Sequence, residues 1–121
     1  MPAKKAFSQI ERELYSCHAE MCKVFSHPTR LQILNTLREE ELSVSELARS
    51  LGVSMGNLSQ HLNMMKQRRV LVSRKDGNNV YYRLANPKIL EAFDLIREIL
   101  FEQMQRESTI VRQMERVRAR S

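Results

Sequence analysis

Apolar residues near the N-terminus recur at alternating spacings of three and four, which places them on one face of an amphipathic helix. This first predicted helix runs from about residue 4 to residue 25, and its apolar residues are Phe7, Ile10, Leu14, Cys17, Met21 and Val24. Ser26-His27-Pro28 then ends this helix and starts another, because proline is tolerated in a first helical turn but not in a helix interior. The second predicted helix extends to the charged run of residues 39–41, and its apolar residues are Leu31, Ile33, Leu34 and Leu37.

Two short helices with clear start signals follow. Ser43 and Glu46 have the spacing of a capping box, and Gly52 supplies the left-handed residue that ends the first of these helices. Ser54 is the expected cap of the next helix. The residues that the two helices are expected to bury are Leu47, Ala48, Leu51, Leu58, Leu62 and Met65. The pattern predicts a helix-turn-helix over about residues 43–68.

A β-hairpin and a long helix complete the predicted fold. Residues 70–75 and 80–84 are rich in β-branched and aromatic side chains and flank Asp76-Gly77-Asn78-Asn79, which predicts a hairpin, or wing, over about residues 70–84. Asn86-Pro87 opens a last helix over about residues 87–117, and we expect the basic end of the chain to fray. Its apolar positions are Leu90, Phe93, Ile96, Ile99, Leu100, Met104, Val111 and Met114. We therefore expect a single mainly helical domain over residues 1–121, a winged helix-turn-helix of order α-α-α-α-β-β-α.

The predicted helix at residues 54–68 carries amide side chains on its outer face. With Leu58 pointing inward and about 100° per residue, Gly56, Gln60, Asn63 and Gln67 point outward, and Asn57 and His61 lie on the flanks. Amide side chains suit contact with base edges, because an amide pairs in two directions with adenine. The segment 62–90 holds seven basic residues and one acidic residue, so it accounts for the whole net charge of +6. Charge concentrated in this way is typical of a phosphate-binding surface.

Four segments in this order resemble the ArsR/SmtB family of small dimeric repressors, over roughly residues 18–100. They are residues 25–34 (FSHPTRLQIL), 45–48 (SELA), 54–62 (SMGNLSQHL) and 74–82 (RKDGNNVYY). The resemblance implies a homodimer joined by the first and last helices, which matches the two long apolar stripes. It also implies that helix 54–68 enters the major groove of operator DNA and that the hairpin tip contacts phosphates. The expected DNA-contacting residues are Ser54, Gly56, Asn57, Ser59, Gln60, His61, Asn63, Lys66, Arg74, Lys75, Asn78 and Tyr82.

The chain departs from the family at both of its usual metal sites. Metal-sensing relatives carry two cysteines in a frame that here reads ELSVSEL over residues 41–47, with Ser43 and Ser45 at the cysteine positions. Neutral hydroxyls are poor ligands for soft ions. Zinc-sensing relatives use histidines and carboxylates on the last helix, and this chain has no histidine after His61. Neither family metal site is expected here.

Cys17, His18 and Cys22 of the first helix remain as candidates for sensing an inducer. Each cysteine is better explained as a small packing residue, since free cysteine is often buried. The functional alternative is a thiol sensor, or a soft-metal or metalloid site assembled across a dimer, with Cys17 as the reactive residue. A Cys17–Cys22 disulfide is disfavoured, because five residues of helix rise about 7.5 Å and the bridging limit is about 7 Å. His18 is more simply a solvated residue, and His27 a helix-start residue.

The leading hypothesis is a sequence-specific transcriptional repressor that an inducer releases from operator DNA. One alternative is a regulator of this type without cysteine-based sensing, controlled by another ligand or by its abundance. A small enzyme is disfavoured, because no nucleophile–base spacing, glycine-rich phosphate loop or inward carboxylate cluster is present. A protein-interaction module without specific DNA binding is the third possibility. Two cysteines form no disulfide framework and no apolar run approaches about 20 residues, so we expect a cytoplasmic protein with no membrane partner.

Overall fold

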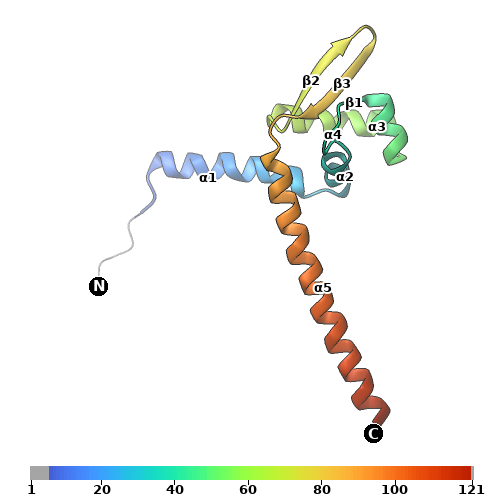
Figure 1. The fold of residues 1–121 in the computed structure, drawn as a ribbon. Helices are drawn as coiled ribbons and strands as arrows, with labels where there is room; N and C mark the ends of the chain where they lie inside the picture. The colour runs from blue at the N-terminus through green and yellow to red at the C-terminus, as the bar shows by residue number, and fades with distance from the viewer. Residues whose placement is uncertain (1–5, 121) are drawn as a thin grey trace. The chain divides into compact units, whose positions relative to one another are not determined.

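The computed structural model describes residues 6–120, so residues 4 and 5 of the predicted first helix lie outside the described residues. The chain divides into two compact units, one ending at Pro87 and the other beginning at Lys88. The elements, shown in Figure 1, are α1 (Gln9–Cys22), the 3₁₀ helix η1 (Lys23–Phe25), α2 (Pro28–Thr36), β1 (Leu42–Ser43), α3 (Val44–Leu51), α4 (Met55–Gln67), β2 (Leu71–Asp76), β3 (Asn79–Leu84) and α5 (Lys88–Arg120). The second unit consists of α5 alone. The predicted winged helix-turn-helix fold is confirmed.

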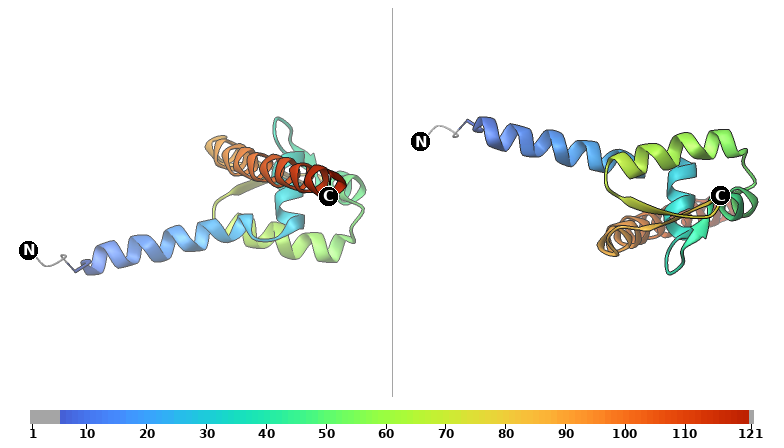
Figure 2. Two further views of the ribbon diagram at one scale, coloured as in Figure 1. Left: turned by 90° about the horizontal axis from the view of Figure 1, so that it is seen from below. Right: turned by 90° about the horizontal axis from the view of Figure 1, so that it is seen from above.

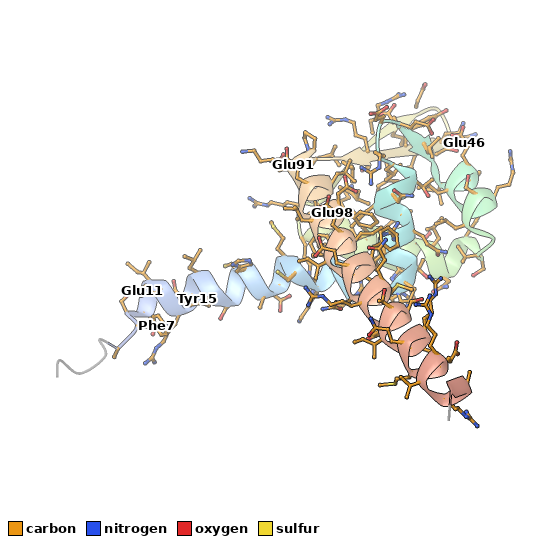
Figure 3. All side chains as sticks on the ribbon, turned by 60° about the horizontal axis from the view of Figure 1, so that its bottom comes forward. Phe7, Glu11, Tyr15, Glu46, Glu91 and Glu98 are labelled. Atoms are coloured by element: carbon orange, nitrogen blue, oxygen red, sulfur yellow. The ribbon has the colours of Figure 1, made fainter. Side chains whose placement is uncertain are left out.

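The helix starts follow from local capping. His27 precedes Pro28, and its Nδ1 accepts the backbone N–H of Thr29 at 3.1 Å. Ser43 and Glu46 form the predicted capping box, with the Ser43 hydroxyl accepting the Glu46 N–H at 3.2 Å (Glu46 is labelled in Figure 3). Ser54 accepts the Asn57 N–H in the same way at the start of α4. These short-range bonds satisfy N–H groups that a helix cannot satisfy itself.

The sheet contains a strand that the sequence pattern did not predict. Strand β1, only two residues long, pairs antiparallel with β3, which gives the strand order β1-β3-β2. The hairpin is tighter than expected, because Asp76 pairs with Asn79 and leaves a two-residue turn. Gly77 takes the first central position of that turn with φ +62°, where a type II′ turn favours glycine. Figure 1 shows β2 and β3 extending together beyond the helices at their base.

The core of the first unit joins α2, α3 and α4 to the base of the sheet. Its buried apolar residues are Val24, Ile33, Leu34, Leu37, Leu47, Leu58, Leu62, Met65, Val70, Leu71 and Tyr82. The expected residues Ala48 and Leu51 are only half-buried, because α3 is short and directs mainly Leu47 into this core.

The two terminal helices are unlike the others, because most of their apolar residues are exposed. No residue of α1 is buried, and Figure 2 shows α1 extending away from α2–α4. Phe7 and Tyr15 contact each other edge-on, with ring centroids 5.3 Å apart (Figure 3), yet both are more than half exposed. In α5, Leu90 and Phe93 are buried. Its exposed apolar residues are Leu95, Ile96, Ile99, Leu100, Phe101, Met104, Ile110, Val111, Met114 and Val117. The helix extends to Arg120, beyond the predicted end near residue 117.

Candidate nucleic-acid interface

The rotation of α4 is fixed by three fully buried side chains, Leu58, Leu62 and Met65. Because helical positions repeat about every 100°, the opposite face is presented to solvent. Its exposed residues are Gly56, Asn57, Gln60, Asn63, Lys66 and Gln67. The predicted outward positions are therefore confirmed as exposed, and Ser59 is half-buried beside them. An exposed helix face bearing amides and few bulky side chains is suited to the major groove of duplex DNA.

His61 lies on the flank of this face and turns toward α2. Its ring centroid lies 4.4 Å from that of His27, and its Nδ1 lies 3.5 Å from Nη1 of Arg30. Burial lowers the pKa of His61, and the nearby His27 and Arg30 lower it further. His61 thus packs against the neighbouring helix while remaining partly accessible at the edge of the outer face of α4.

Tyr82 is a correction to the predicted DNA contacts. Only 7% of the residue is exposed, and burial raises the pKa of its hydroxyl. Side chains alternate between the faces of a strand, so Tyr82 points into the core while its neighbours Tyr81 and Arg83 point to the other face of the sheet. We therefore remove Tyr82 from the set of proposed DNA-contacting residues.

Arg74 is held by other residues of the protein. Its Nη2 lies 2.6 Å from Oε1 of Glu41, and its guanidinium lies over the Tyr81 ring, 4.6 Å from the centroid. The hydrogen bond from Arg74 lowers the pKa of Glu41. Lys75 and Asn78, near the tip of the hairpin, are exposed. A phosphate that contacts Nε or Nη2 of Arg74 must compete with Glu41, whereas Lys75 meets no such competitor among the contacts of the described residues.

Arg68, at the end of α4, connects this helix to α1. Its Nε donates to the carbonyl oxygen of Glu20 at 3.0 Å, and its Nη2 lies 2.8 Å from Oε2 of the same residue. The hydrogen bonds from Lys23 and Arg68 lower the pKa of Glu20. The basic segment is therefore less cationic in the fold than in the sequence, because Arg68 and Arg74 are paired with acids outside it. The acids lie 48 and 33 positions away along the chain, so no local signal in the sequence identifies the pairs.

Both cysteines are free and exposed in the single chain, so the chain's own core does not bury them. Cys17 lines a surface groove of about 470 Å³ between α1 and the end of α4, together with Glu20, Arg68 and Arg69. His18 is exposed on α1. Within residues 6–120, no three His, Cys, Asp or Glu side chains come together in a group that could hold a metal ion. No helix in this part of the chain has the length and apolar character needed to span a bilayer.

The fold and the exposed face of α4 define a winged helix-turn-helix protein. Residues 27–72 match the family model described as "Bacterial regulatory protein, arsR family". The HTH-type transcriptional regulator Rv0081 of Mycobacterium tuberculosis is 40% identical to this chain over 88 residues, which cover 72% of this chain and 77% of the relative. The biofilm growth-associated repressor of Xylella fastidiosa is 32% identical over 85 residues, covering 70% and 75%. The chain therefore belongs to the arsR family of bacterial transcriptional regulators.

Solved structures agree with this assignment. The crystal structure of Rv0081 matches with a TM-score of 0.70 and 36% identity over 78% of this chain and 95% of that one. The homodimeric winged helix-turn-helix DNA-binding domain of Mb0332 from Mycobacterium bovis matches with a TM-score of 0.72 and 26% identity, covering 81% and 91%. The resemblance inferred from the four sequence segments is confirmed.

Proposed function

We propose that this arsR-family regulator is a homodimer that represses transcription by binding a specific operator, and that it has no enzymatic activity. The observation that carries the proposal is the outer face of α4, where exposed amides stand opposite a fully buried apolar stripe. In this proposal Gln60 and Asn57 contact bases, and Ser54, Gly56, Ser59, Asn63 and Lys66 line the same groove. Lys75 and Asn78 contact phosphates, and Arg74 does so after leaving Glu41.

The proposed dimer uses α1 and α5. Both helices expose large apolar side chains along most of their length, and exposed apolar surface of this extent is unusual for a monomer. The related Mb0332 domain is described as homodimeric, which supports the same assembly here. A dimer presents two copies of α4, and the distance between them would set the spacing of the two operator half-sites.

The test of DNA reading begins with selection of bound duplexes from a random pool. The enriched sequence and a scrambled duplex are then compared by fluorescence anisotropy at the same salt concentration. A sequence-specific regulator is expected to prefer its operator by about 10³-fold or more. Equal affinity for both duplexes would contradict sequence-specific reading and would favour the interaction-module alternative.

For the inducer, we propose that Cys17 is the control point. Its groove adjoins the Arg68–Glu20 pair, which joins α1 to the end of α4. Cys17 and Glu20 are three positions apart on α1, so they share one face of the helix. A group attached to Cys17, or a soft metal bound there, would crowd this connection and shift α4 relative to α1. Such a shift is a way to bias the dimer between two states with different operator affinity.

The test is operator release by arsenite, by a mercurial or by a persulfide donor. The parent and Cys22→Ser are expected to release the operator, and Cys17→Ser to retain it. An equal response of all three proteins, or no response in any of them, would contradict cysteine sensing. The DNA-binding proposal would then stand with control by another ligand or by abundance.

A further inference from the structure

Three side chains that can carry positive charge meet where the start of α2 lies against the middle of α4. They are His27, the N-cap of α2, Arg30 of α2 and His61 of α4, and we name them the histidine–arginine cluster. The two imidazole centroids are 4.4 Å apart, with the rings tilted by 46°, and Nη1 of Arg30 lies 3.5 Å from Nδ1 of His61. Nη2 of Arg30 donates to the carbonyl oxygen of Lys23 at 2.8 Å. The Nε atom of Arg30 is buried and has no hydrogen-bond partner within the described residues.

The contacts of the cluster favour a neutral imidazole at His61 in the unbound protein. Nδ1 of His27 accepts the Thr29 N–H as the cap of α2, so its proton belongs on Nε2. Nδ1 of His61 faces a guanidinium donor, so its proton also belongs on Nε2. A second proton on His61 would remove this acceptor and place a cation beside Arg30. The groups that affect the pKa of His61 electrostatically are His27 and Arg30, and no carboxylate within residues 6–120 contributes.

The histidine–arginine cluster therefore brings hydrogen-bond donors together with no carboxylate beside them among the described residues. We propose that it binds a backbone phosphate of the operator and that His61 takes up a proton as the phosphate docks. The inference rests on the proposed DNA binding, because His61 is on the flank of the same helix whose outer face carries Gln60. DNA phosphates line the edges of the groove that a reading helix enters, and contacts to them position the protein. A phosphate at this edge supplies the negative charge that the cluster lacks.

Proton uptake on binding makes operator affinity depend on pH. The phosphate favours the imidazolium, so the pKa of His61 is higher in the complex than in the free protein. Affinity therefore rises as the pH falls from 7.5 to 6.0, by up to about tenfold per pH unit for each subunit that takes up one proton. Random duplexes show the same trend, because every duplex carries phosphates.

The experiment measures operator affinity by anisotropy at pH 7.5, 7.0, 6.5 and 6.0 at constant ionic strength, with folding checked by circular dichroism at each pH. His18 is the remaining histidine of the chain and is exposed on α1, so His18→Gln is the matched control. The parent and His18→Gln are expected to gain affinity with acid, and His61→Gln is expected to lose most of the dependence. His27→Asn keeps a side chain that can cap α2 and is expected to flatten the dependence in part.

Calorimetry in two buffers of different ionisation enthalpy provides a second measurement that needs no variant. At pH 6.5 the parent is expected to take up protons on binding the operator, at most one for each His61. A parent that binds tightly at every pH without proton uptake, or a His61→Gln protein with the parent's dependence, would overturn the inference and leave DNA binding intact. Failure to bind any duplex at any pH would overturn the proposed function, and the inference with it.

Discussion

Gln60 and Lys75 represent two kinds of DNA contact that single substitutions can separate. Gln60→Ala is expected to reduce the preference for operator over scrambled DNA by about 1–3 kcal/mol, because the lost contact is to a base edge. Lys75→Ala is expected to weaken binding to both duplexes alike and to reduce the slope of log K against log salt by roughly one unit. Arg74→Ala is expected to reduce that slope less, since Glu41 already neutralises Arg74. The same pattern in Gln60→Ala and Lys75→Ala would contradict the assignment.

His61 also affects folding stability, with a pH dependence opposite to that of binding. Its pKa in the folded protein lies below the usual value, so the unfolded chain takes up a proton first as the pH falls. The contribution of neutral His61 is fully present above about pH 6.5, the unperturbed histidine value, and is lost as the pH falls through that value and toward the lower folded one. Thermal unfolding between pH 7.5 and 5.5 is expected to show a steeper fall in Tm for the parent than for His61→Gln. Equal slopes would show that His61 titrates normally in the fold.

At the scale of elements, the start of α3 offers a direct test of local capping. Ser43 is 6% exposed and completes the capping box with Glu46. Ser43→Ala removes the acceptor for a helix N–H and is expected to lower the free energy of unfolding by about 1–2 kcal/mol. Ser45→Ala, on an exposed position of the same helix, is the control and is expected to change it by less than about 0.5 kcal/mol. Urea unfolding measures both, and equal losses would contradict the role of the cap.

The helices and strands that were predicted correctly are those whose start or end is determined by residues a few positions apart. Pro28, the Ser43–Glu46 spacing, Gly52 and the hairpin turn each act within a few positions, so their structure could be predicted without the fold. Strand β1 could not be predicted in this way, because two residues show no periodicity and the partner strand β3 is distant in the chain. Tyr82 was wrongly predicted to contact DNA. The alternation of Tyr82 and Leu84 with the polar Arg83 shows that Tyr82 and Leu84 share one face of the hairpin. It does not show which face packs against the helices, so the burial of Tyr82 could not be predicted from it.

The charge of the segment 62–90 was also predicted only in part. The sequence shows that positive charge is concentrated near the end of α4 and in the hairpin, but a count of charged residues cannot show which of them form ion pairs. Arg68 and Arg74 are paired through the fold with Glu20 and Glu41, which are remote in sequence. Exposed ion pairs contribute little to stability because solvent screens the charges, so a phosphate can compete with Glu41 for Arg74. Arg68, only 23% exposed, serves instead to hold α1 and α4 together.

At the scale of the whole molecule, the exposed apolar residues of α5 argue for association. The helix has 33 residues, a length of about 50 Å, and an isolated helix with such side chains in water lacks the packing that normally stabilises helices. Ile96 and Leu100 are 55% and 49% exposed in the single chain. Glutamate at both positions would therefore place charge in the proposed dimer interface and would leave the buried core of the first unit unchanged.

The double variant Ile96→Glu, Leu100→Glu is expected to be monomeric by light scattering at micromolar concentration, while the parent has twice the 14.2 kDa chain mass. Circular dichroism should show that its first unit remains folded, because that unit has its own buried core. Gln105→Glu with Thr109→Glu adds the same charge on the face of α5 opposite Ile96 and Leu100 and is the matched control, expected to remain dimeric. A monomer cannot engage two half-sites at once, so operator affinity should fall far more than affinity for random DNA. A monomeric parent that binds its operator tightly would contradict the dimer and require a different role for the exposed apolar faces of α1 and α5.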